Sequence, residues 1–196
     1  MNPLTQLPHP DASTLDRLHA RLVETAAADG TLDIAYRTLD SPLGSLLLAA
    51  SATGLVRVAY ASEGHDAVLA SLAGRVSPRV LRAPARLDDA AHEIDDYFAG
   101  RRRTFDLPLD LQLAHGFRRE VLAHLRDITY GTTASYAAVA TAAGRPAAVR
   151  AVGTACAVNP LPIVIPCHRV VRSDGSLGGY VGGVAAKQAL LALEAG

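Results

Sequence analysis

The sequence predicts an α+β protein, with a small antiparallel sheet and helices in its first part and a mostly helical second part. Two observations predict this fold class. Short apolar segments bounded by turn residues occur between residues 33 and 60, a spacing typical of a meander of hairpins. After residue 112, apolar residues recur at helical spacing instead. With 196 residues, 49% of them apolar, the chain can bury a core in one large or two small domains.

Residues 1–30 form an N-terminal extension whose function cannot be read from the pattern. A short amphipathic helix is predicted there by the spacing of Leu15, Leu18, Leu22 and Val23. A first domain is expected over 31–111, with strands at 33–39, 44–50 and 55–60 and helices at 66–73 and 85–99. Turn residues at 41–44 and 52–54 separate the strands, and Gly100 ends the second helix. Residues 107–111 are expected to be a short strand or connector.

The second domain, residues 112–196, begins with a predicted helix over 117–125. A helix over 135–143 follows, with Thr133 or Ser135 as its N-cap, and Pro146 then precedes a helix over 147–158. Two helices joined by a short Gly-containing turn indicate a helix-turn-helix, a pattern that many helical hairpins share. The second of them has mostly small residues, so Arg150 is either a projecting probe or a solvated side chain on a tightly packed helix. A last helix is predicted over 184–193.

Composition excludes several classes of protein. No apolar stretch reaches 18 residues, and residues 1–30 lack the basic start and apolar run of a secretory signal. Since Cys156 and Cys167 are the only cysteines, we expect no disulfide scaffold and no cysteine-rich zinc site, and we expect a cytoplasmic protein. No metal ligand is assigned, and a metal in the first domain is left open. Residues 1–111 carry 11 basic and 15 acidic residues (−4), and residues 112–196 carry 8 and 4 (+4). This asymmetry favours a polyanionic partner only weakly.

The candidate reactive centre is Pro166-Cys167-His168-Arg169, which lies inside an apolar run from 163 to 171. A thiol, an imidazole and a guanidinium would each need a partner if they were buried. Neighbouring positive charge and a base lower the pKa of a cysteine, so the segment is suited to forming a nucleophilic thiolate. Cys156 is interpreted as a small buried apolar residue.

The Cys167 segment and several others occur in the order and spacing of a known family. The segments are 130–136, 148–153, 159–160, 165–171, 178–180 and 187–194. On these motifs the chain resembles the O6-alkylguanine-DNA alkyltransferases, also called methylated-DNA–protein-cysteine methyltransferases. The resemblance is strong over 117–194, weaker over 33–111 (through 40–44 and 97–100), and absent from 1–30. It implies that the first domain has a ribonuclease-H-like fold.

The resemblance implies DNA repair by irreversible, single-turnover transfer of an alkyl group from O6-alkylguanine, or from O4-alkylthymine, to Cys167. No cofactor is implied, because the sulfur itself is the acceptor. His168 is implied to act as a base towards Cys167 through a water, while Glu194 fixes the imidazole tautomer. Asn159 is implied to link the Cys167 segment to the helix-turn-helix. The phenol of Tyr180 is implied to donate to the guanine as charge develops on the leaving base.

The resemblance also implies that a monomer binds double-stranded DNA and turns the damaged nucleotide out of the stack. Arg150 would fill the vacated space, and Tyr136 would press on the 3′ phosphate, with the helix in the minor groove. The other residues implied in substrate binding are Ser135, Pro162, Val170, Val181, Gly178, Gly179 and Lys187. Contacts to the DNA backbone would make binding largely independent of sequence. Cooperative binding along DNA is left open.

Three residues depart from the common family pattern: Thr129, Ala134 and Leu122. None carries chemistry, so we expect altered packing or DNA contacts with activity retained. A non-catalytic DNA-binding module or regulator stays open as an alternative, although binding-only relatives have tryptophan where this chain has Cys167. A Cys-His-Glu hydrolase is a further alternative, although the sequence pattern indicates no oxyanion hole for it.

Overall fold

The computed structural model describes residues 11–196, so the first ten residues of the predicted N-terminal extension lie outside it. Within the described residues a four-stranded sheet has the order β3-β2-β1-β4. The strands are β1 (Ile34–Leu39), β2 (Leu46–Ala50), β3 (Leu55–Tyr60) and β4 (Val80–Arg82). The predicted antiparallel meander of β1, β2 and β3 is confirmed. The short strand β4, which the pattern did not predict, adds a parallel pairing to β1, so the sheet is mixed.

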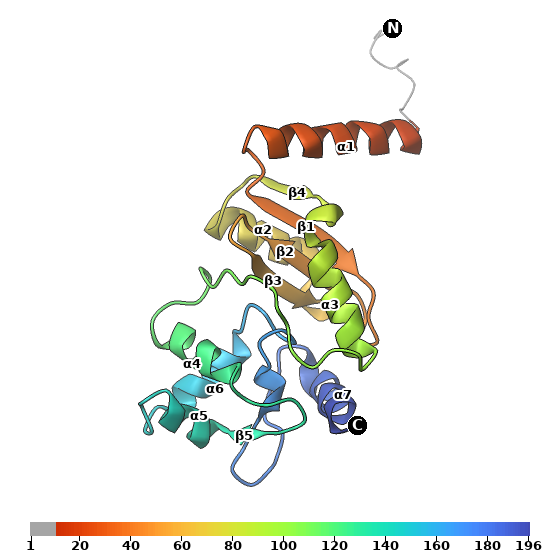
Figure 1. Cartoon of the computed structure of the whole chain (residues 1–196). Coiled ribbons are helices and arrows are strands. Elements are labelled where there is room, and N and C mark those ends of the chain that lie inside the picture. Colours follow the sequence, from red (N-terminus) through yellow and green to blue (C-terminus); the bar gives the residue numbers. More distant parts are fainter. Residues whose placement is uncertain (1–10) are drawn as a thin grey trace, which may run out of the picture.

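Helices cover both faces of this sheet (Figure 1). One is α2 (His65–Arg75), whose Val68 and Leu72 pack on one face. On the other face lies α3 (Asp88–Phe98), preceded by a 3-10 turn over Pro84–Leu87. Since both faces are covered, every residue of β2 is buried, which explains its unbroken apolar sequence.

The predicted N-terminal helix is α1 (Ala12–Ala28), with Asp11 as its N-cap. Ala26 is buried in the main hydrophobic cluster, while Leu15, Leu18 and Leu22 are each about half exposed. Figure 1 shows α1 beside β4, at the end of the molecule away from α5 and α6. Among residues 11–196, no helix has the length and apolar character needed to cross a membrane.

The second part contains α4 (Phe117–Leu125), α5 (Tyr136–Ala142), α6 (Val149–Ala157) and α7 (Gly183–Ala195). Helices α5 and α6 form the predicted helix-turn-helix. Ser135, rather than Thr133, is the N-cap of α5, because its side chain accepts from the N–H of Ala138 at 3.0 Å. Pro146 lies in the turn before α6, which starts two residues later than predicted. A two-stranded parallel ladder pairs β5 (Ala134–Ser135) with β6 (Val170–Val171).

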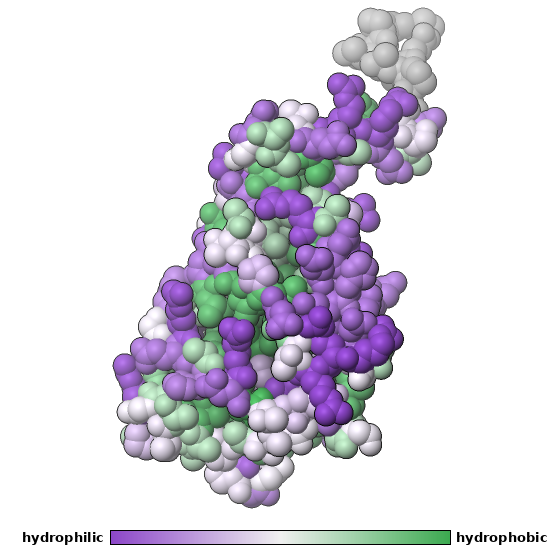
Figure 2. All heavy atoms as spheres, viewed as in Figure 1, coloured by the Kyte–Doolittle hydropathy of each residue, from purple (hydrophilic) through white to green (hydrophobic). Residues whose placement is uncertain are grey.

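The connection between the two parts runs along β3. Leu55 donates to the carbonyl of Pro108 and accepts from the N–H of Asp110, both at 2.8 Å, which confirms a short extended connector at 107–111. One continuous hydrophobic cluster includes residues of the sheet, α3, α4 and α7. Figure 2 shows hydrophilic surface over α3 and apolar atoms in the region between the sheet and the helical part. The domain division at residue 111 stays a prediction.

Candidate active site

The segment that carries Cys167 is a buried loop between α6 and β6. All residues from 161 to 170 are buried, and Cys167 begins a 3-10 turn, Cys167–Arg169. Ile163 is the one non-glycine residue with positive φ (74°) in the described chain. A β-branched residue is strained in that conformation, so the surrounding structure must hold the loop in place.

Asn159 provides much of that restraint. Its side chain is fully buried and donates to the carbonyl of Ile165 at 2.9 Å and to Sγ of Cys167 at 3.2 Å. The amide oxygen accepts from the N–H of Leu161 at 3.0 Å. Because Asn159 directly follows the helix-turn-helix, it joins that motif to the reactive loop, as the resemblance implies.

The environment of the thiol differs from the one that the sequence predicts. Burial raises the pKa of Cys167 to about 11, against the lowering effects of the Asn159 hydrogen bond and the Lys187 charge. The neighbours in sequence do not supply the positive charge, because Arg169 directs its guanidinium to Glu194. Because adjacent side chains on a turn point in different directions, a neighbour of Cys167 in sequence need not lie near its thiol. The expected low thiol pKa is therefore wrong for the site without substrate, and the thiol is protonated there.

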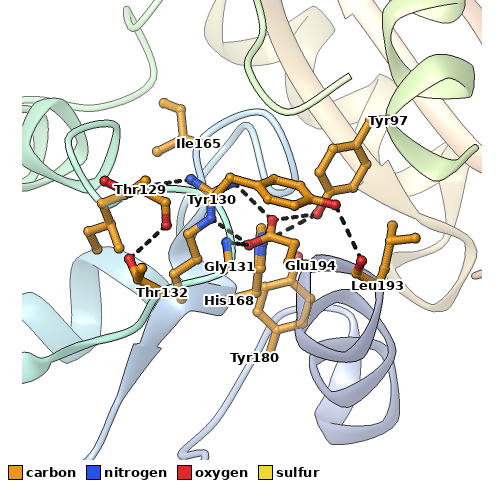
Figure 3. Close-up of polar contacts among 12 residues, drawn as sticks. Tyr97, Thr129, Tyr130, Gly131, Thr132, Ile165, His168, Tyr180, Leu193 and Glu194 are labelled. Atoms are coloured by element: carbon orange, nitrogen blue, oxygen red, sulfur yellow. Dashed lines mark hydrogen bonds and ion pairs between the residues drawn. The ribbon is translucent and has the colours of Figure 1, made fainter. Parts of the chain in front are cut away.

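Glu194 lies at the centre of a buried polar network that also includes His168 (Figure 3). Nε2 of His168 is 2.8 Å from Oε1 of Glu194. Arg169 donates to both carboxylate oxygens, at 2.8 and 2.9 Å. The hydroxyl of Tyr97, which comes from α3, donates to Oε1 at 2.7 Å, and the N–H of Gly131 donates to Oε2 at 3.2 Å. A charge-assisted network of this kind compensates for burying the carboxylate.

These contacts determine the protonation states of the pair. Burial would raise the pKa of Glu194, but hydrogen bonds from His168 and Arg169 outweigh it and lower the pKa to about 2. Burial lowers the pKa of His168, so its imidazole is neutral at neutral pH. An ionised carboxylate can only accept, hence Nε2 of His168 carries the ring proton. Its Nδ1, buried and without a hydrogen-bond partner in the described chain, is left as the basic nitrogen.

A cavity of about 590 Å³ is lined by Tyr180, whose ring centroid is 6.3 Å from that of His168. Its lining contains six residues that the sequence analysis singled out: Tyr136, Arg150, Gly178, Gly179, Tyr180 and Val181. Gly178 (φ 64°) lies so close to Tyr136 that an added Cβ would be 2.8 Å from the phenol oxygen. A larger residue would therefore displace the Tyr136 side chain or the loop itself.

The other predicted binding residues lie outside the lining of this cavity. Pro162 and Val170 are buried in the reactive loop, and Ser135 caps α5. Lys187 is fully buried and donates to the carbonyls of Val170, at 2.5 Å, and of Leu177. Lys187 thus holds the loop before Tyr180 against β6, which gives it a supporting place behind the cavity.

Sequence reasoning missed several residues of the site. Arg172 lines the cavity, and Tyr60 of β3 contacts Tyr180, but neither stands in a motif that could have indicated this. Tyr97 lies in segment 97–100, which carries part of the family resemblance. That match could have indicated Tyr97 as a site residue. Among the departures from the family pattern, Leu122 is a buried core residue, so it changes packing rather than chemistry.

Comparison with known proteins assigns the family. Residues 116–196 match the profile described as 6-O-methylguanine DNA methyltransferase, DNA binding domain, and residues 34–111 match the ribonuclease-like domain of the same description. The chain belongs to this family. It is therefore an enzyme, a DNA-repair methyltransferase, and the expected ribonuclease-like and helical parts are both confirmed.

Individual relatives of this methyltransferase agree with the assignment. A methylated-DNA–protein-cysteine methyltransferase of Mycolicibacterium paratuberculosis is 40% identical over 82% of this chain and 92% of its own length. The bifunctional transcriptional activator/DNA repair enzyme Ada of Escherichia coli is 42% identical over 84% of this chain but only 46% of its own. The crystal structure of Mycobacterium tuberculosis OGT in complex with DNA superimposes with a TM-score of 0.73 at 38% identity, over 82% of this chain and 92% of that one.

Proposed function

We propose that this methyltransferase repairs O6-alkylguanine in double-stranded DNA by moving the alkyl group, once and irreversibly, to Sγ of Cys167. The observation that carries the proposal is the buried thiol held by Asn159, beside a His168–Glu194 pair in which Nδ1 of His168 is unprotonated and has no hydrogen-bond partner in the described chain. O4-alkylthymine presents the same alkylated exocyclic oxygen and is proposed as a second substrate. The free thiol that the reaction needs suits a reducing compartment such as the cytoplasm, where we expect the protein to act as a monomer.

The chemical step is a displacement at the alkyl carbon. Cys167 gives its proton to Nδ1 of His168 through a water, and Glu194 stabilises the imidazolium that forms. Sγ then bonds to the alkyl carbon, while the bond from that carbon to O6 breaks and leaves its electron pair on the guanine. The released guanine takes up one proton, which balances the proton that the thiol lost. Tyr180 donates a hydrogen bond to the base as the negative charge develops.

No turnover follows, because regeneration would require water to displace the Cys167 thiolate from the alkyl carbon, and an uncharged alkyl thioether is stable to water. The thiol pKa of about 11 also explains why the site needs His168, because the thiol does not ionise by itself at neutral pH. A thiol that is mostly protonated in the empty site is protected from other electrophiles, and it becomes nucleophilic only when the base removes its proton.

A guanine inside the duplex cannot reach Cys167, so we propose that the nucleotide rotates out of the stack into the cavity of about 590 Å³. Arg150 is exposed on α6 at the rim of this cavity, which suits a side chain that fills the space left behind. Tyr136 lines the same cavity from α5, and we expect its side chain to press on the 3′ phosphate. Small residues on α6 allow the helix to approach the minor groove closely.

Mass spectrometry after incubation with an O6-methylguanine oligonucleotide tests the acceptor. We expect a gain of one methyl group on Cys167, stoichiometric with the loss of the lesion. Cys167→Ser should abolish transfer and keep DNA binding. The matched control is Cys156→Ser, which removes the other buried thiol and should leave transfer intact. Lesion removal by Cys167→Ser would refute the assignment. DNA binding by the wild-type protein without methyl transfer would favour a non-catalytic module, and turnover on an ester would favour a hydrolase.

The role of Arg150 is tested by comparing two substrates. Arg150→Ala should slow transfer from duplex DNA by at least tenfold, because the unstacked state loses the side chain that fills it; tenfold corresponds to about 1.4 kcal/mol. Transfer from free O6-benzylguanine, which needs no unstacking, should change little. Arg21→Ala removes the same charge from α1, at the far end of the molecule, and is the control. Equal losses of rate on both substrates would contradict the proposed role.

A further inference from the structure

Tyr60, at the end of β3, contacts the active-site phenol from the ribonuclease-like side. Its hydroxyl oxygen is 2.9 Å from that of Tyr180, and the two rings meet edge to face with centroids 5.9 Å apart. Tyr60 is 3% exposed and is absent from the lining of the substrate cavity, whereas Tyr180 lines it. The two phenols therefore form a hydrogen-bonded pair, in which Tyr60 is on the interior side and Tyr180 is on the cavity side.

The position of Tyr60 is fixed from two sides. Its backbone N–H donates to Oε1 of Glu63 at 2.9 Å, and the other oxygen of Glu63 pairs with Arg57. Above the ring, Gly182 comes so close that an added Cβ would be 2.7 Å from two ring carbons of Tyr60. Gly182 has an ordinary φ of −81°, so this close approach, rather than its backbone conformation, requires glycine.

The direction of the hydrogen bond is inferred from which hydroxyl a group in the cavity can reach. A phenol carries a single proton to donate, and a buried donor normally has an acceptor. Within the described residues each hydroxyl has only the other as a partner, so either could be the donor. Tyr60 is closed off from the cavity, whereas Tyr180 lines it, so donation by Tyr60 is the arrangement that leaves the remaining proton on the side that a bound group can reach. Burial raises the pKa of both phenols, which keeps both protons in place. Tyr180 then accepts from Tyr60 and has its own proton free for a group in the cavity.

We propose that Tyr60 is a positioning residue for alkyl transfer, which donates to Tyr180 and so directs the Tyr180 proton towards the leaving base. The hydrogen bond from Tyr60 also spreads the negative charge that Tyr180 meets as the bond from the alkyl carbon to O6 breaks. This inference rests on the proposed function and assigns to the ribonuclease-like domain a part in the chemistry. Tyr60 itself makes no contact with the substrate.

A double-mutant cycle tests the proposal, with single-turnover transfer from O6-benzylguanine as the assay. Tyr60→Phe keeps the ring under Gly182 and removes only the hydroxyl. It should lower the rate constant at saturating substrate by about tenfold, the loss expected for one hydrogen bond to a group that meets developing charge. The dissociation constant and the thermal midpoint should stay close to those of the wild-type protein. Tyr36→Phe, which removes a phenol from β1, is the matched control.

The second arm combines Tyr60→Phe with Tyr180→Phe. If Tyr60 acts through Tyr180, the double variant should transfer at the rate of Tyr180→Phe alone. An unchanged rate in Tyr60→Phe, or an equal further loss in the Tyr180→Phe background, would overturn the inference. Failure of the wild-type protein to take up the methyl group from an O6-methylguanine oligonucleotide, run beside the assay, would instead overturn the proposed function, so the two outcomes are distinguishable.

Discussion

At the scale of single residues, Glu194 shows how position in the fold gives a side chain its properties. By sequence it stands near the end of the last helix, where a carboxylate opposes the helix dipole. In the structure its side chain is 1% exposed and accepts hydrogen bonds from residues of α3, the turn before β5 and the reactive loop. These contacts keep the carboxylate ionised, and the ionised carboxylate in turn sets the tautomer of His168.

Replacing Glu194 with Gln should therefore damage both stability and chemistry. Arg169 would be left buried without its carboxylate, which typically costs about 3–5 kcal/mol. The amide could also donate to Nε2 of His168, which would place the ring proton on Nδ1 and remove the base, with an expected loss of about 100-fold in transfer rate. Denaturant unfolding and single-turnover kinetics measure the two effects. Glu120→Gln, at an exposed pair with Arg145, is the control and should change stability by less than about 0.5 kcal/mol. Full activity in Glu194→Gln would contradict this role.

At the scale of elements, the connector 107–111 is attached to the sheet by a turn that only glycine can make. Gly54 has φ 153°, and a Cβ there would overlap the carbonyl of Pro108. The same turn places Leu55 for its two hydrogen bonds to the connector. Asp110 adds a third attachment, since Ser51 donates to its carboxylate at 2.5 Å. The path of the chain into the second part thus depends on the β2–β3 turn.

Gly54→Ala should lower the free energy of unfolding by about 2 kcal/mol or more, because both the backbone conformation and the contact with Pro108 become strained. Gly74→Ala is the matched control. Gly74 lies within α2, and nothing is within 4 Å of the position of its Cβ. Because alanine favours a helix over glycine, this variant should gain up to about 1 kcal/mol. Denaturant midpoints measure both, and equal effects of the two substitutions would contradict the interpretation of Gly54.

At the scale of the whole molecule, the two family domains form one structure around the reactive loop. A single hydrophobic cluster joins them, and it includes Tyr60, Tyr97 and Cys167. Two phenols of the first part also reach the site directly, Tyr97 at Glu194 and Tyr60 at Tyr180. The ribonuclease-like part therefore completes a site whose reactive cysteine lies in the other part.

A shared core predicts that residues 31–196 unfold in one cooperative transition. Far-ultraviolet circular dichroism, which follows the helices, and tyrosine fluorescence, which follows the packing, should give coincident curves. Tyr97→Ala should lower the free energy of unfolding by about 3–5 kcal/mol as measured by either probe, because it leaves a cavity at a fully buried position in the shared cluster. Two separate transitions, of which only one moves in Tyr97→Ala, would show that the parts are independent.

The sequence by itself determined the features that depend on neighbours along the chain. The three-stranded meander and the helix-turn-helix follow from local pattern, and the choice of Cys167, His168 and Glu194 as candidate residues follows from motifs and the family resemblance. The pattern left Thr133 and Ser135 both open as the N-cap that the structure assigns to Ser135. Strand β4 was missed because three residues carry too little pattern, and its pairing with β1 depends on how α2 crosses the sheet.

Only the tertiary structure decided which groups meet. It turned Arg169 away from the thiol towards Glu194, buried Cys167 so that its pKa rises, and brought Tyr97 and Tyr60 to the site from the other part of the chain. The physical reason is that burial and hydrogen bonding depend on distances in space. Spacing along the sequence records such distances only within a helix, a strand or a turn.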